Sequence, residues 1–303
     1  MSRYCNAAAM LFSTRASRGA KDAGDIVLKE TADALESMRG YGLDLIVLSE
    51  GVEAFGQTID TAEDVTAPGP FLSLYLDFAA KEKCTVAGSV KIRENGCVHN
   101  SIAFVTPDGR IAGVYHKTFL TDGEITSGLT PGKGAVVADS PAGLLGGAVC
   151  FDLNFDMIRD GYRAKKPGII CFASMYHGGL MQKLWAYHCR SYFISALPFI
   201  GGGILDPFGR AVALSDCYTA HPSARINLDY VMVHLDFNRD TFPAIRKKYR
   251  DEVTIDIPAD IGPALMFSNT EKRTAMDIVR EYGLELLDDY LDRMIIANEK
   301  NRA

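Results

Sequence analysis

Short apolar runs, recurring between helical and hairpin patterns, are the feature that most constrains this chain. The segments Leu43–Leu48, Leu144–Val149 and Ile169–Phe172 are almost wholly apolar, which is typical of buried strands. Helical spacing lies between such runs, as from Asp22 to about Tyr41, whereas turns such as Pro107-Asp108-Gly109-Arg110 indicate hairpins. This mixture predicts an α/β fold in which helices cover mixed sheets, a four-layer α-β-β-α sandwich if two sheets face each other.

The other segments extend this pattern. Further strands are predicted at Cys5–Phe12, Thr85–Ile92, Val98–Thr106, Ile111–His116, near Val136, and at Phe193–Leu197, Gly203–Pro207, Ala211–Ser215 and Val231–Phe237. Further helices are predicted at Phe71–Glu82, after Cys150 to about Ala164, and at Leu180–Tyr192, Phe242–Tyr249 and Thr270–Met294. Residues 117–134 are polar and rich in Gly and Thr, and they are expected to form a long functional loop.

We expect one domain. Residues 1–255 form its main part, and residues 256–303 are a C-terminal extension of the same domain that begins extended and ends in a long helix. The chain start, Met1 to Phe12, lacks the cleavage site of a signal peptide and is interpreted as the first strand. The apolar face of the C-terminal helix is a predicted oligomer contact.

Composition excludes several classes of protein. Of the 303 residues 48% are hydrophobic and 23% charged, with a net charge of -6, so no basic footprint for nucleic acid is expected. No apolar run approaches the length of a membrane helix. The seven cysteines are scattered without a C-x-x-C pair, which favours reduced thiols and a cytoplasmic location. The metal-ligand candidates Cys171, His177, His188 and Cys189 lack regular zinc spacing, so no metal is expected.

Cys150 is the strongest candidate for a nucleophile. It follows the apolar run Leu144–Val149, and Asp152 and Asn154 offer caps for a helix directly behind it. A thiol at such a junction lies beside free backbone N–H groups and the positive end of a helix dipole. This setting predicts a thiolate, although most free cysteines are inert core residues.

Two other predicted strands also end beside a reactive group. Glu50 follows the apolar run Leu45–Leu48, and Lys117 follows Val114–His116. Each taken alone is more often a solvated surface charge. Glu53 is close to Glu50 in sequence, and no role is assigned to it.

Together, Glu50, Lys117 and Cys150 resemble the Glu–Lys–Cys triad of the nitrilase superfamily, the carbon–nitrogen hydrolases, in chain order and in position. The resemblance covers about Cys5 to Phe237. It is carried by Leu48-Ser49-Glu50, His116-Lys117-Thr118, Cys150-Phe151-Asp152-Leu153-Asn154-Phe155, Trp185 with Arg190, and Gly203-Ile204-Leu205-Asp206-Pro207-Phe208-Gly209. The chain departs from the family at Asn154 and at Asp156-Met157, where Arg and Pro-Glu are usual.

The resemblance implies a mechanism without metal or organic cofactor. Cys150 would attack the substrate, Glu50 would move protons, and Lys117 with the backbone N–H of Phe151 would hold the oxyanion. Many members of the family have a second glutamate after the lysine, and Glu124, seven residues after Lys117, is the candidate for positioning substrate. Members generally pair, so a homodimer or higher homo-oligomer is expected.

The resemblance also bears on the substrate. Nitrilases proper usually carry Cys-Trp-Glu, whereas Cys150-Phe151-Asp152 is closer to the amidase and N-carbamoyl-amide branches. A linear amide or N-carbamoyl amide is therefore expected, hydrolysed through a thioester to an acid and ammonia or an amine. The alternatives are a nitrile substrate, or a catalytically silent relative that serves in binding or assembly. There is no G-x-S-x-G elbow and no phosphate-binding loop.

Overall fold

The computed structural model describes residues 4–198 and 200–302, and divides the chain into two compact units. The first unit is Met1–Ile226 and the second is Asn227–Ala303. The boundary expected from sequence, after residue 255, falls inside the second unit, within strand β14 (Val253–Asp256).

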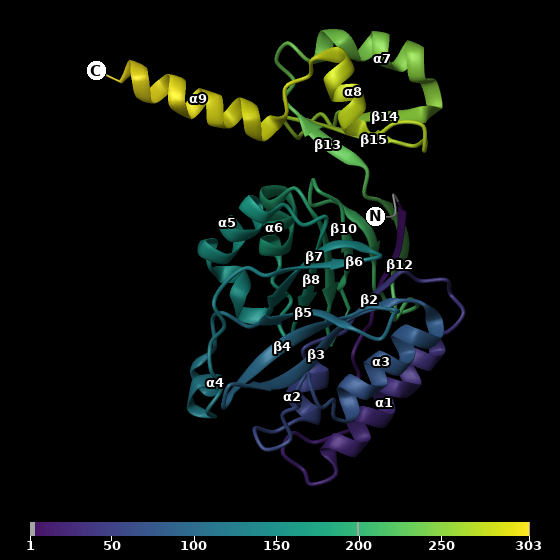
Figure 1. The fold of residues 1–303 in the computed structure, drawn as a ribbon, viewed down its shortest axis with the longest axis vertical. Helices are drawn as coiled ribbons and strands as arrows, with labels where there is room; N and C mark the ends of the chain where they lie inside the picture. Colours follow the sequence, from purple (N-terminus) through teal and green to yellow (C-terminus); the bar gives the residue numbers. More distant parts are fainter. Residues whose placement is uncertain (1–3, 199, 303) are drawn as a thin grey trace. The chain divides into compact units, whose positions relative to one another are not determined.

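Two six-stranded mixed sheets form the first unit (Figure 1). The first sheet has the order β12 (Ser223–Asn227), β1 (Tyr4–Ala9), β2 (Leu45–Val47), β3 (Thr85–Glu94), β4 (Cys97–Val105) and β5 (Ile111–His116). The second has the order β11 (Ala211–Leu214), β10 (Gly203–Leu205), β9 (Tyr192–Ala196), β8 (Ile169–Ala173), β7 (Gly143–Val149) and β6 (Val137–Ser140). In each sheet three strands, β1-β2-β3 or β7-β8-β9, run parallel, and the hairpin strands beside them are antiparallel.

Helices cover the outer face of each sheet. Apolar side chains of α1 (Ala23–Ser37) and α3 (Pro70–Glu82) join the core of the first sheet, and those of α5 (Asp156–Lys165) and α6 (Leu180–Cys189) join that of the second. The inner faces meet closely, since a Cβ added to Gly147 of β7 would lie 2.7 Å from Cβ of Tyr115 in β5. The predicted α/β class and four-layer sandwich are confirmed.

Two sequence-based expectations about helices are wrong. Residues 117–134 contain a short helix, α4 (Asp122–Thr126). The long tail helix is two helices, α8 (Ala275–Tyr282) and α9 (Leu287–Asn301), because Gly283 at φ +62° terminates α8 in the left-handed conformation. The helix expected after Cys150 is α5, which a 3-10 turn, η1 (Cys150–Asn154), and the extended residue Phe155 precede.

The second unit has a core of its own. Its antiparallel sheet has the order β13 (Tyr230–Val233), β15 (Ala264–Ser268), β14, and it packs with α7 (Phe242–Tyr249) and α8. Among the described residues, no helix combines the length and apolar character needed to span a bilayer.

Candidate active site

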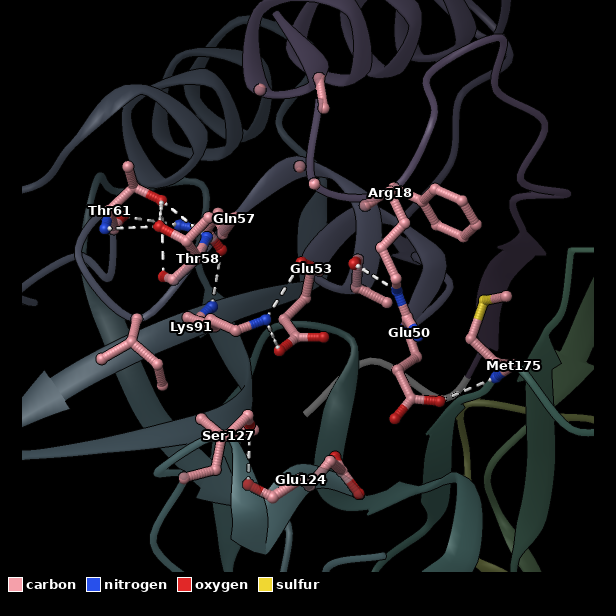
Figure 2. A pocket seen from close by; sticks show the side chains of 18 of the residues that line it. Arg18, Glu50, Glu53, Gln57, Thr58, Thr61, Lys91, Glu124, Ser127 and Met175 are labelled. Carbon is pink, nitrogen blue, oxygen red and sulfur yellow. Dashed lines mark hydrogen bonds and ion pairs between the residues drawn. The ribbon is translucent and has the colours of Figure 1, made fainter. Parts of the chain in front are cut away.

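The ends of three strands bring Glu50, Lys117 and Cys150 to one cavity of about 780 Å³. Glu50 follows β2 and precedes helix α2 (Gly51–Gly56), Lys117 follows β5, and Cys150 follows β7. Glu124, from α4, lines the same cavity. The four side chains singled out from the sequence therefore share one site, and Figure 2 shows Glu50 and Glu124 at its wall.

The ammonium of Lys117 lies between two carboxylates. Its Nζ donates to Glu50 Oε1 at 2.8 Å and to Glu124 at 2.9 Å, and the residue is only 1% exposed. Burial opposes the charge, but Glu50 and Glu124 outweigh it and raise the pKa of Lys117 above its ordinary value. The lysine is therefore a permanent buried cation.

Backbone and amide donors fix the Glu50 carboxylate as well. Its Oε2 accepts from the backbone N–H of Met175 at 2.8 Å, and its Oε1 accepts from Asn100 Nδ2 at 2.9 Å in addition to Lys117. Asn100 also donates to Glu124 at 2.9 Å, so one amide bridges both carboxylates. Sequence reasoning missed Asn100, although the polar run His99-Asn100-Ser101 inside an otherwise apolar strand is a signal that could have revealed it.

Both oxygens of Glu124 lie 2.9 Å from Lys117 Nζ. Oε2 also accepts from the backbone N–H and the hydroxyl of Thr121, both at 2.9 Å, in a capping box that begins helix α4. Oε1 also accepts from Asn100 at 2.9 Å. Although burial opposes it, Lys117 and these hydrogen bonds hold the pKa of Glu124 below its ordinary value, so the group is a carboxylate. This capping box is why the expected loop is partly helical.

Cys150 is in a strained backbone conformation, with φ of +46°, a region that residues other than glycine rarely adopt. Burial, the charge of Glu50 and a hydrogen bond to Glu50 raise the pKa of the thiol to about 12, against the opposing effect of Lys117. The expectation of a thiolate is therefore wrong. The short turn η1 supplies little dipole, and the neighbouring carboxylate favours the proton.

Asp152 forms hydrogen bonds with residues next to Lys117 and next to Cys150 in the sequence. One oxygen accepts from the backbone N–H groups of Thr118 and Phe119, at 3.2 and 2.9 Å. The other accepts from the hydroxyl of Tyr115 at 2.7 Å and from the N–H of Val149 at 2.9 Å. Burial raises the pKa of Asp152 to about 6 in spite of these bonds. The residue belongs to the motif noted in the sequence, but its spatial role was not visible there.

The opposite wall of the cavity carries a second buried ion pair. Lys91 of β3 donates to the carboxylate of Glu53 in α2, and Gln57 accepts from the backbone N–H of Lys91 at 2.7 Å (Figure 2). Burial raises the pKa of Glu53, and Glu50 adds to the effect, whereas Lys91 opposes it. Glu53, to which the sequence assigned no role, therefore lines the same cavity as Glu50.

The residues first considered as metal ligands do not converge. Cys171 is buried in β8, and His188 Nε2 pairs with Asp160 at 2.8 Å. Within the described part of the chain, one cluster of His and carboxylate groups is close enough to hold an ion, formed by Glu94, His99 and His116 outside the cavity.

Comparison with known proteins decides the family. The carbon–nitrogen hydrolase family matches residues 24–199, more than half of the chain. The chain belongs to the carbon–nitrogen hydrolase family. The predicted membership of the nitrilase superfamily is confirmed, and the protein is a hydrolase of carbon–nitrogen bonds.

Individual relatives of this hydrolase are distant. The chain is 23% identical over 255 residues to "Omega-amidase, chloroplastic" of Arabidopsis thaliana, covering 72% of this chain and 67% of that protein. It is 24% identical over 196 residues to "Omega-amidase NIT2-A" of Xenopus laevis, covering 56% and 70%. The crystal structure of Saccharomyces cerevisiae Nit3, a nitrilase superfamily member, superposes with a TM-score of 0.65 at 16% identity, over 82% of this chain and 95% of that one, which supports the fold.

The raised pKa of the Cys150 thiol predicts how the protein responds to alkylation. Because the thiolate is the reactive form, the rate at which iodoacetamide modifies Cys150 should rise about tenfold per pH unit from pH 7 to pH 10 without a plateau. Peptide mass spectrometry at each pH would follow Cys150 separately from the exposed Cys97 and Cys217. A plateau below pH 8 would mean that the thiolate is the resting form after all.

Proposed function

We propose that this hydrolase cleaves a small polar linear amide or N-carbamoyl amide through a thioester on Cys150. The observation that carries the proposal is that Glu50, Lys117 and Cys150 line one cavity, in which the Glu50 carboxylate binds the buried ammonium of Lys117 at 2.8 Å and its charge raises the pKa of the Cys150 thiol. A nucleophile, its base and a fixed cation thus share one site, as acyl transfer requires.

Glu50 is the proposed general base in the first half of the reaction. Because the thiol holds its proton at rest, attack on the amide carbonyl carbon transfers that proton from Cys150 Sγ to Glu50 as the S–C bond forms. An ammonium has three N–H donors, and Lys117 directs two of them to Glu50 and Glu124. The third, with the backbone N–H of Phe151, would stabilise the tetrahedral oxyanion.

Protonated Glu50 then acts as the general acid. It gives the proton to the leaving nitrogen as the C–N bond breaks, so ammonia or an amine departs and the thioester remains. Glu50, again a carboxylate, takes a proton from water as the water oxygen attacks the thioester carbon. The acid leaves, the proton returns to Cys150 Sγ, and no metal or organic cofactor takes part.

The residues that line the cavity favour a substrate whose acyl group is polar. Four basic residues, Arg18, Lys21, Lys91 and Lys117, and four acidic ones, Asp25, Glu50, Glu53 and Glu124, are among its lining residues. Gln57, Thr58 and Thr61 add uncharged hydrogen-bonding groups on the side of the Glu53–Lys91 pair (Figure 2). The named relatives are omega-amidases, which are also consistent with an amide substrate that carries a polar group.

A substrate panel read by ammonia or amine release tests the reaction class. It should contain ω-amides of dicarboxylic acids, simple aliphatic amides, N-carbamoyl amino acids and the matching nitriles. We expect turnover of an amide or carbamoyl amide that carries a charged group, slower turnover of its uncharged analogue, and little release from nitriles. Preferred turnover of nitriles would contradict the amide assignment, and no turnover of any compound would favour a silent relative.

Glu124 is the proposed positioning residue, and Glu124→Gln tests it. The amide can still accept from Thr121 at the helix cap, but it lacks the charge that faces Lys117. We expect kcat to fall roughly a hundredfold, the scale of a positioning loss, with little change in melting temperature. Asp122→Asn is the matched control, because Asp122 is exposed on the same short helix. Equal activity of the two variants would show that Glu124 has no role in turnover.

We also propose that the protein is at least a homodimer and is located in the cytoplasm. The exposed side chains of Ile295 and Ile296 in α9 give the tail an apolar surface that a second copy could cover, and seven free thiols suit a reducing compartment. Light scattering at micromolar concentration should give at least twice the chain mass of 33.0 kDa. A monomer mass would exclude the dimer, and truncation before Asp256 should weaken it if the tail contributes.

A further inference from the structure

Three potential metal ligands meet on one face of the first sheet, outside the catalytic cavity. Glu94 ends β3, His99 lies in β4, and His116 ends β5. Their ligand atoms all lie within 4.8 Å of one another. The strand register places them together. In β4, Cys97, His99 and Ser101 share one face of the sheet, because residues two apart in a strand point the same way. Glu94 pairs with Cys97 and His116 pairs with Ser101, so both lie on the same face as His99.

Each imidazole has a hydrogen-bond partner at its Nδ1 atom. His99 Nδ1 is 2.8 Å from the carbonyl oxygen of Thr130, which can only accept, so Nδ1 carries the proton. Ser101 Oγ lies 2.7 Å from His116 Nδ1, and its hydroxyl can also donate to the carbonyl oxygen of His99 at 3.2 Å. The neutral tautomer with its proton on Nδ1 presents a lone pair at Nε2, and metal-binding histidines are usually oriented by such second hydrogen bonds.

The cluster places the Glu94 carboxylate beside two stacked imidazole rings. His116 Nε2 lies 3.4 Å from Glu94 Oε2, and the two rings stack with centroids 4.1 Å apart. Two neutral imidazoles and a carboxylate this close together can each direct a lone pair at one cation.

We propose that Glu94, His99 and His116 form a binding site for a zinc ion. Two imidazoles and one carboxylate are a known zinc ligand set that leaves a fourth position for water. Ligand distances of about 2.0–2.2 Å require the groups to close on the ion. Glu94 is exposed at the tip of the β3–β4 hairpin, so its side chain can move to meet it.

The ion would crosslink β3, β4 and β5 at the ends that carry part of the active site. His99 precedes Asn100, which bonds Glu50 and Glu124, and His116 precedes Lys117. Zinc that binds the folded chain alone raises its stability by mass action. The site lies outside the catalytic cavity, and its effect is measurable without an assay of turnover.

Zinc titration of the full-length protein tests the site. The background is Cys150→Ala, which removes the catalytic thiol as a competing ligand. We expect one zinc ion per chain by calorimetry, a raised melting temperature, and no comparable response to Mg²⁺, which prefers oxygen ligands. Absence of stoichiometric zinc binding would overturn the proposal.

Ligand variants locate the ion. Glu94→Gln, at an exposed position, and His116→Gln should each weaken zinc binding tenfold or more and abolish the shift in melting temperature. His188→Gln is the control, because His188 also pairs with a carboxylate, Asp160, away from the cluster. Binding that survives Glu94→Gln and His116→Gln, or that falls equally in the control, contradicts the site.

X-ray absorption distinguishes the site from adventitious binding at exposed thiols. The proposed ligands give zinc distances of about 2.0–2.2 Å only, whereas thiolates give about 2.3 Å. Cys97→Ser and Cys217→Ser should leave zinc affinity unchanged. A sulfur shell, or loss of binding in either serine variant, would assign the ion to a thiol and reject the cluster.

Discussion

The site depends on one buried ammonium between two carboxylates. Lys117 has almost no contact with solvent, and removing its charge would leave Glu50 and Glu124 close together and unneutralised. Breaking a buried ion pair in this way costs several kcal/mol, about 3–5. Asn100 reduces that cost by donating to both carboxylates at 2.9 Å. The same arrangement that stabilises three charges also holds the Glu50 carboxylate in the cavity that Cys150 lines.

The two sheets supply different parts of this arrangement, so catalysis depends on how they face each other. Glu50 and Lys117 come from the first sheet, whereas Cys150 comes from the second. Hydrogen bonds connect the segments that follow strands of the two sheets. Ser49, after β2, donates its hydroxyl to the carbonyl of Ser174, after β8, at 2.9 Å, and Met175 donates its backbone N–H to Glu50. Asp152 joins the segments after β5 and β7. A shift of either sheet would separate the base from the nucleophile.

Sequence reasoning identified the residues that end apolar strands, because a charged group after a buried run is conspicuous. Glu50, Lys117 and Cys150 each follow such a run, their resemblance to the nitrilase superfamily triad implied their roles, and the alternation of strands and helices predicted the sandwich. Sequence reasoning failed for properties that depend on residues distant in sequence but close in space. The pKa of Cys150 depends on Glu50, one hundred residues earlier, and the buried partners Glu53 and Lys91 carry no local pattern. It also predicted α8 and α9 as one helix, because the helical spacing of apolar residues continues on both sides of Gly283, where the structure has a turn.

The central claim is that Cys150 becomes acylated while Glu50 handles its proton. The most direct measurement is rapid acid quenching during turnover of an amide substrate, followed by peptide mass spectrometry. The account predicts that the peptide with Cys150 gains the mass of the acyl group in the wild-type protein, and that Glu50→Gln gains none because the thiol keeps its proton. An acyl group on Cys84, Cys171 or Cys189, or turnover with Cys150 unmodified at every quench time, would contradict it.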